Sequence, residues 1–528
     1  MSFDRKRPLV LVCQAVAASL FIVSSLCGMT AVHAQASLPT LGDSSDLTTA
    51  QERQLGDRII RELYRDPDYI DDAVLNEYVY SIFQPLVKAA RERGELSPEL
   101  DERFAWEILL GRDRTVNAFA LPGGYFGVHL GLIGVVSTRD ELASVMAHEL
   151  SHVTQRHISR LITQQNRQTP LMLGALVLGA LAASKSPNAA QALMIGGQAV
   201  AVQNQLNFSR DMEREADRVG YGLMAPAGFA PQGFVAMFDK LQQANRINDN
   251  GSWPYLRSHP LTTQRIADMH SRLPPSGTPA AAPLAPSLEH VMMAARARVL
   301  ARPGVDVWRQ WTTEPQGTGF AAQPLPRRAA AWYAAALSAS QLQDVPAARH
   351  ALLGLMDTVR GDAPATRQAK LLGAEIEFAA GDFNAALQQL PQGQAQAQTP
   401  GAGSPASSRR PEMVLRTQAL LRTGNAQEMT GPLQTRVATH PHDATVWHLL
   451  AAVWQQQNHP LRAVRAEAEA HAARYDYQAA VDRFKAGQDL ARKSGSRGGD
   501  AADYIDASII ETRLRAVELL LKEQAAER

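Results

Sequence analysis

Two histidines four residues apart, with a glutamate directly after the first, are the feature of this sequence most able to do chemistry. They form the run His148-Glu149-Leu150-Ser151-His152. Residues four apart on a helix lie on one face, so both imidazoles can reach one metal ion. Glu149 then lies beside the ion and can take a proton from the attacking water. The spacing predicts a zinc-dependent hydrolase with His148 and His152 as ligands and Glu149 as general base.

A catalytic zinc ion needs a third protein ligand and one open position. Both cysteines, Cys13 and Cys27, lie in the apolar N-terminal segment, so the ligand must be His, Asp or Glu. Glu213 and Asp217 are the best candidates, because they are one helical turn apart. In this interpretation Glu213 binds the metal and Asp217 accepts a hydrogen bond from a ligand histidine. A solvated acidic face, paired with neighbouring arginines, is an alternative that spacing alone leaves open.

Composition predicts a protein of two or three domains without a nucleic-acid partner. The chain has 528 residues, of which 45% are hydrophobic and 20% charged. These values are typical of globular proteins, and the length exceeds that of one ordinary core. Lys and Arg number 53 against 52 Asp and Glu, so no basic excess attracts nucleic acid.

Residues 1–34 resemble a secretory signal. Arg5, Lys6 and Arg7 precede an apolar stretch, and small residues surround Ala34. We expect cleavage after Ala34 and a periplasmic mature chain without cysteine. An uncleaved membrane anchor is the alternative.

The elements that must position the candidate site can be read from periodicity and turn residues. A capping box of Thr138 and Glu141 begins the helix that carries both histidines. Pro122 to Gly124 make the turn of a hairpin. The patterns predict helices over 47–93, interrupted at Pro85, over 139–160 and over 210–224, and strands over 104–110, 117–121 and 125–130.

Two apolar runs, 171–183 and 189–202, stand out between the two motifs. Each is shorter than the roughly 20 residues that a helix needs to cross a bilayer. A buried helical hairpin is one interpretation. A flap in peripheral contact with a membrane or an apolar substrate is the other.

The rest of the chain predicts a helical repeat domain at 287–525. A linker rich in Pro, Ala and Gly at 273–286 separates it from the catalytic domain at 35–272. Similar five-residue motifs begin at Asp344, Asp382 and Asp476, and the pattern resembles degenerate tetratricopeptide (TPR) repeats. An unrelated helical bundle is the alternative. The expected fold is mainly α with a small β-sheet.

The two motifs together resemble the HtpX and CAAX-prenyl-protease type of zinc metallopeptidase. The resemblance rests on 148–152, on 213–217 and on Asn117–Gly124, and it covers about 47–272. It implies a zincin-like domain with one zinc ion per chain, Glu213 as the third ligand and Asp217 orienting a ligand histidine.

With its N-terminal segment and its repeats, the chain is also similar to periplasmic proteases that assist outer-membrane β-barrel assembly. This resemblance implies unfolded or misassembled envelope proteins as substrates. It also implies an outer-membrane assembly machine as partner of the repeats. The rival hypothesis is a TPR-based chaperone or adaptor whose protease site is gated or rarely active.

Three further features bear on the mechanism. His259, held extended by Pro260, either donates to the oxyanion or caps the metal. Arg265 is a candidate for binding the oxyanion or a substrate carboxylate, whereas His157 is expected to be structural. The strand at 117–121 could pair with an extended peptide.

Overall fold

The computed structural model describes the greater part of the chain from Leu47 onward. The signal segment and both apolar runs lie outside the described residues, as does nearly all of the linker. No helix among the described residues is long and apolar enough to cross a bilayer. The described residues are 47–164, 210–246, 252–272, 286–391, 409–495 and 501–526.

The first described helices are α2 (Thr49–Arg65), α3 (Ala73–Glu92) and α4 (Pro98–Arg103). The expected interruption at Pro85 is wrong, because α3 continues through it. Proline has no N–H to donate to the carbonyl four residues earlier, at Ser81. Arg139 donates to that carbonyl at 2.8 Å, so the helix loses no hydrogen-bond partner there.

A mixed four-stranded sheet lies beside these helices, with the order β1-β2-β4-β3. The predicted hairpin is confirmed, since β3 and β4 are antiparallel, whereas β2 and β4 are parallel. The strand expected from Phe104 begins only at Glu107, because Trp106 has a φ of 51°, outside the range of strands. The strands are β1 (Tyr69–Ile70), β2 (Glu107–Gly111), β3 (Ala118–Leu121) and β4 (Tyr125–His129).

The helix predicted at 139–160 is two helices. After the short α5 (Leu130–Val135), α6 spans Arg139–Thr154 and α7 spans His157–Gln164. Arg156, with a φ of 52°, breaks the hydrogen-bond ladder between them. Thr138 accepts from the Glu141 N–H as predicted, but the Glu141 carboxylate accepts from Ser137.

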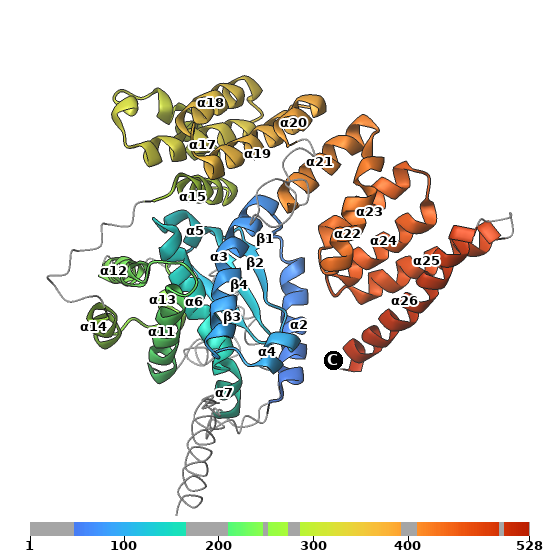
Figure 1. Cartoon of the computed structure of the whole chain (residues 1–528), viewed down its shortest axis with the longest axis horizontal. Coiled ribbons are helices and arrows are strands. Elements are labelled where there is room, and N and C mark those ends of the chain that lie inside the picture. The colour runs from blue at the N-terminus through green and yellow to red at the C-terminus, as the bar shows by residue number, and fades with distance from the viewer. Residues whose placement is uncertain are drawn as a thin grey trace, which may run out of the picture. The chain divides into compact units, whose positions relative to one another are not determined.

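Helices α11 (Arg210–Met224) and α12 (Gln232–Arg246) both pack against α6. Gly220 permits a close crossing, because a Cβ there would lie 3.1 Å from the backbone of Ala147. The short α13 (Tyr255–Ser258) and α14 (Thr263–Ser271) follow. Figure 1 shows α6 and α11 side by side next to the sheet.

From Ser287 onward the described chain is helical (Figure 1). Successive helices pack against one another, as α17 does against α18 and α23 against α24. The α-helices are α15 (Leu288–Leu300), α16 (Val305–Thr313), α17 (Leu325–Gln341), α18 (Val345–Thr358), α19 (Ala363–Ala379), α20 (Phe383–Gln389), α21 (Arg410–Thr423), α22 (Thr430–Thr439), α23 (Ala444–Gln456), α24 (Pro460–Ala472), α25 (Tyr477–Gly495) and α26 (Ala501–Ala526). Short 3₁₀ turns are η1 (Glu314–Gln316), η2 (Phe320–Ala322) and η4 (Ala426–Met429).

The repeated five-residue motifs begin helices. Asp344, Asp382 and Asp476 each accept a hydrogen bond from the backbone N–H three residues later. Such caps satisfy a donor that the first helical turn leaves free. The alanine four residues after each aspartate is buried, which lets neighbouring helices approach closely. The predicted class, mainly α with a small sheet, is confirmed.

The region before residue 273 and the first C-terminal helices share one hydrophobic core. Helix α15 packs against α5, and its Met292 and Met293 are fully buried in the same cluster as Leu142 and Met146 of α6. A second cluster is centred on α23, and a third joins α24, α25 and α26.

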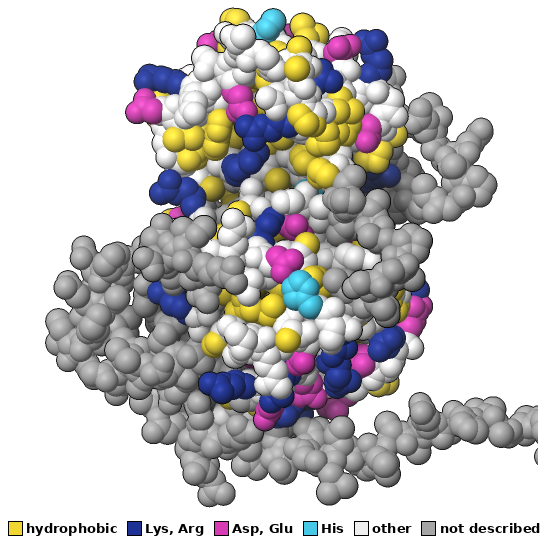
Figure 2. Space-filling model, turned by 90° about the vertical axis from the view of Figure 1, so that its left-hand side faces the viewer, with side chains coloured by type: hydrophobic (Ala, Val, Ile, Leu, Met, Phe, Trp, Pro, Cys, Tyr) yellow, Lys and Arg dark blue, Asp and Glu magenta, His cyan; other side chains and the backbone are white. Residues whose placement is uncertain are grey.

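The surface mixes charges of both signs. Figure 2 shows lysine and arginine beside aspartate and glutamate, with hydrophobic side chains gathered in the upper half of the face. Large exposed hydrophobic residues on α16, α17 and α18 include Val305, Leu325 and Leu353.

Candidate metal centre

Helix α6 presents His148 and His152 on one face. Their Nε2 atoms lie 3.0 Å apart, and both residues are buried. Glu149, one residue further on, is 1% exposed. The helix periodicity that predicts this convergence is therefore present in the structure.

Helix α11 brings Glu213 to the same point. Its carboxylate oxygens lie 3.5 Å from Nε2 of His148 and 3.6 Å from Nε2 of His152. Glu213 and Asp217 are each 2% exposed, so the alternative of a solvated acidic face is wrong.

Asp217 and Arg265 support this arrangement. Asp217 lies 3.0 Å from Nδ1 of His148, on the side of the ring that faces away from Glu213. Arg265 donates to both oxygens of Asp217, at 2.6 and 2.8 Å, and pairs with Glu213 at 2.7 Å. Since Arg265 is itself buried and pairs with two carboxylates, it holds them in place, and its candidate role in binding the oxyanion or a substrate carboxylate stays a prediction.

His259, the C-cap residue of α13, completes the cluster. Its Nδ1 lies 3.0 Å from Glu213 and 3.3 Å from Nε2 of His148, while its Nε2 lies 3.4 Å from Glu149. Tyr255 stacks on its ring at 4.6 Å between centroids. One ligand atom each from His148, His152, Glu213 and His259 fall within 4.8 Å of one another. All six predicted site residues are thus brought together.

Sequence reasoning missed the contacts of His157. Its Nδ1 lies 2.9 Å from Nδ1 of His152, and its Nε2 lies 3.0 Å from Glu215, which also pairs with Arg160. If Nε2 of His152 is free to bind a metal, Nδ1 carries the proton and donates it to His157. Nε2–H of His157 then donates to Glu215. No local sequence pattern predicts this series of hydrogen bonds, because it depends on the helix break at Arg156.

The protonation states follow from burial and from neighbouring charges. Although burial opposes ionisation, His259 and His148 hold the pKa of Glu213 well below its ordinary value. Burial lowers the pKa of His152 well below its usual range. Burial would also lower the pKa of His148, but Asp217 and Glu213 outweigh it and raise that pKa to about 9. An ionised carboxylate at Glu213 and a neutral imidazole at His152 are forms that bind metals, whereas His148 would release its proton when a metal binds.

The donor set fits a metal ion such as zinc. Two imidazole nitrogens and a carboxylate oxygen are the ligands of many catalytic zinc sites. Both oxygens of Glu149 are buried and make no well-formed hydrogen bond within the described chain, where Nε2 of His259 approaches one of them only to 3.4 Å. A buried carboxylate without such a partner is costly, and a water or a cation at the centre of the cluster would supply one.

Comparison with known proteins agrees with this geometry. The family model described as Peptidase family M48 matches residues 76–273. The beta-barrel assembly-enhancing protease of Escherichia coli is 29% identical over 440 residues, which cover 82% of this chain and 83% of that protein. The mitochondrial metalloendopeptidase OMA1 of Saccharomyces cerevisiae is 27% identical over 201 residues, 37% of this chain and 55% of that protein.

A Vibrio cholerae protein, whose name assigns it provisionally to the same group as the Escherichia coli protease, is 38% identical over 279 residues. That match spans 51% of this chain and about half, 53%, of the relative. The buried His-Glu-His cluster and the matched segment lead to one conclusion: residues 76–273, which match the model of peptidase family M48, form a metallopeptidase domain.

Proposed function

We propose that this protein is an exported zinc endopeptidase that cleaves unfolded or misassembled envelope proteins. The observation that carries the proposal is the convergence of His148, His152 and Glu213 on one buried point beside Glu149. In the proposed enzyme these three residues bind one zinc ion per chain, and Asp217 and Arg265 hold the ligands in place.

The residues of the chain would divide the chemistry as follows. A bound zinc ion supplies Lewis acidity that polarises the scissile carbonyl and acidifies the attacking water. Glu149 takes the water proton and passes it to the leaving amine. Burial raises the pKa of Glu149, which makes it a better base than an exposed carboxylate. The outer strand β3 offers its backbone to an extended peptide, which favours unfolded substrates.

Replacing Glu149 with Gln tests the catalytic role. The amide keeps the shape of the side chain but cannot accept the proton, so we expect kcat to fall by roughly 10² to 10⁴. Cleavage of casein by the full chain measures kcat, and elemental analysis measures zinc. Zinc content should not change. Normal cleavage by the variant would refute the mechanism.

Substrate and location rest on the relatives and on residues 1–34. A protease named for enhancing beta-barrel assembly supports outer-membrane proteins as the substrate class. Export predicts a periplasmic product that lacks residues 1–34. Fractionation of cells that express the tagged full chain checks this.

We infer that His259 caps the metal in a resting state. Its Nδ1 belongs to the same cluster as the three proposed ligands. The cavity that reaches His148 and His259 measures about 10 Å³, which is room for about one water and not for a peptide. Catalysis would then require His259 to leave the cluster.

His259→Ala distinguishes this cap from the oxyanion role. Removal of a cap should raise basal casein cleavage severalfold, because the substrate no longer competes with an imidazole. A lower kcat at constant zinc content would instead assign His259 to the oxyanion.

The adaptor hypothesis remains the second candidate, supported by similarity to the Escherichia coli protease that extends over 440 residues, well beyond the metallopeptidase domain. Glu149→Gln separates the two in cells. If the variant restores full envelope function to a deletion strain, the helical region is the main actor.

A further inference from the structure

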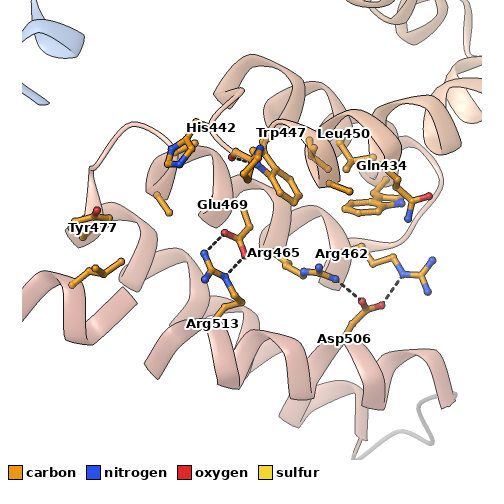
Figure 3. Close-up of a pocket in the computed structure, with 17 residues that line it drawn as sticks. Gln434, His442, Trp447, Leu450, Arg462, Arg465, Glu469, Tyr477, Asp506 and Arg513 are labelled. Atoms are coloured by element: carbon orange, nitrogen blue, oxygen red, sulfur yellow. Dashed lines mark hydrogen bonds and ion pairs between the residues drawn. The ribbon is translucent and has the colours of Figure 1, made fainter. Parts of the chain in front are cut away.

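The last helices enclose a pocket of about 640 Å³ that is remote in sequence from the metal centre. Figure 3 shows side chains from several helices pointing into it. Its volume is in the range of pockets that bind small ligands or a few residues of a peptide. Its walls come from α22, α23, α24 and α26, with Tyr477 of α25 at one side.

One wall is apolar and comes from α23. Trp447, Leu450 and Trp454 lie along it. The indole N–H of Trp447 donates to the carbonyl of Pro441 at 2.9 Å, so this residue offers only its ring. Trp454 is 3% exposed, and its N–H has no hydrogen-bond partner among the described residues. Buried indole N–H groups normally find an acceptor, so this unpaired donor, which has almost no accessible surface, is an unusual feature of the wall.

The other wall is charged and joins α24 to α26. Arg513 grips both oxygens of Glu469, each at 2.7 Å. Arg462 pairs with Asp506 at 2.7 Å through Nε. These two ion pairs hold the helices together, and Figure 3 shows both.

Arg465 is different from the other two arginines. It reaches Asp506 only at 3.4 Å, through one terminal nitrogen, and its buried Nε finds no partner within the described chain. Three arginines therefore face two carboxylates. Arg465 has the longest of these contacts, while Arg462 binds Asp506 through Nε alone. His442, whose pKa burial lowers, adds no charge at neutral pH.

We propose that this pocket binds an extended segment of a partner protein in which an acidic side chain lies between apolar ones. The carboxylate would pair with the terminal nitrogens of Arg465, whose side chain is 23% exposed. Helix α24, which carries Arg465, packs between α23 and α26. Apolar lining residues lie on both sides of α24, with Leu450 on one side and Leu520 on the other. A peptide whose acidic residue is internal, with apolar residues before and after it, therefore fits better than a chain end. This binding is separate from proteolysis, since no residue of the metal centre lines the pocket.

Calorimetric titration of three short peptides tests the proposal. All are acetylated and contain Ser-Phe-X-Phe-Ser. In two peptides X is Glu or Gln and the C-terminus is amidated. In the third X is Gln and the C-terminal carboxylate is free. The protein is the full chain carrying Glu149→Gln, so that no peptide is cut. The Glu peptide should bind about ten- to a hundredfold more tightly than the amidated Gln peptide.

Two variants should change peptide binding in opposite directions. Arg465→Gln should abolish the preference for Glu. Asp506→Asn should increase the affinity for the Glu peptide severalfold, because it removes the carboxylate that contacts both Arg462 and Arg465. A purely structural role for these residues would not give tighter binding. Arg483→Gln is the matched control, as this arginine pairs with Glu467 outside the pocket. Melting temperatures establish that each variant is folded.

Equal binding of the Glu and Gln peptides would overturn the proposal, as would an Arg465→Gln variant that keeps the preference. Tightest binding of the peptide with the free carboxylate end would overturn it in favour of recognition of a chain end.

Discussion

Each proposed histidine ligand is held by a partner on its outer nitrogen. Asp217 serves His148, and the His157–Glu215 pair serves His152. Such partners fix the tautomer and orientation of a ligand. Asp217 could be predicted because it lies one turn after Glu213 on an uninterrupted helix. His157 could not, because on a continuous helix it would point away from His152.

The partner of His152 makes a prediction at this scale. His157→Ala should weaken zinc binding by about 10- to 100-fold, because His152 loses the acceptor that keeps its Nε2 available. Competition with a chelator of known affinity measures the effect without relying on activity. His270→Ala, at an exposed histidine of α14, is the control. Unchanged zinc affinity in His157→Ala would show that the contact with His152 does not support the ligand.

At the scale of elements, periodicity and turn residues predicted the hairpin and the two motif helices. The errors are at Pro85, Trp106 and Arg156, where tertiary contacts override local preference. Arg139 compensates for the proline, and two bulky residues adopt positive φ without a glycine to announce it. Local sequence carries no sign of either effect, because the compensating groups lie elsewhere in the chain.

The crossing of α6 and α11 makes a second prediction. Gly220→Val should push α11 away from the Ala147 backbone, destabilise the fold by about 1–3 kcal/mol and weaken zinc binding as Glu213 moves. Melting and zinc titration measure both effects. Gly222→Val on the same helix is the control, because its Cβ would meet only the flexible end of Arg93. Equal behaviour of the two variants would contradict this role for the crossing.

At the scale of the molecule, partly buried ion pairs connect the start of α3 to the C-terminal helices. Arg296 of α15 pairs with Asp72 at 2.6 Å, and Arg410 of α21 pairs with Asp71 at 2.7 Å. Because α15 also shares the core of the catalytic region, the described residues from Leu47 onward act as one compact unit. The composition of the linker suggests two independent domains, so the shared core could not be predicted from composition.

Glu107 of β2 makes the stability of this unit depend on pH. Burial raises the pKa of Glu107 to about 7, although a hydrogen bond from Tyr64 opposes the shift. Between about pH 4.5 and pH 7 the folded chain therefore holds a proton that the unfolded chain releases, so this residue's contribution to stability falls as pH rises. The loss is on the order of 3 kcal/mol. Glu107→Gln cannot ionise, and it should be more stable than the parent at pH 7.5 by about that amount, with little difference at pH 4.5.

Denaturant unfolding at the two pH values measures this, with the exposed Glu62→Gln on α2 as control. A parent-to-variant difference that is the same at both pH values would show that Glu107 does not titrate in this range.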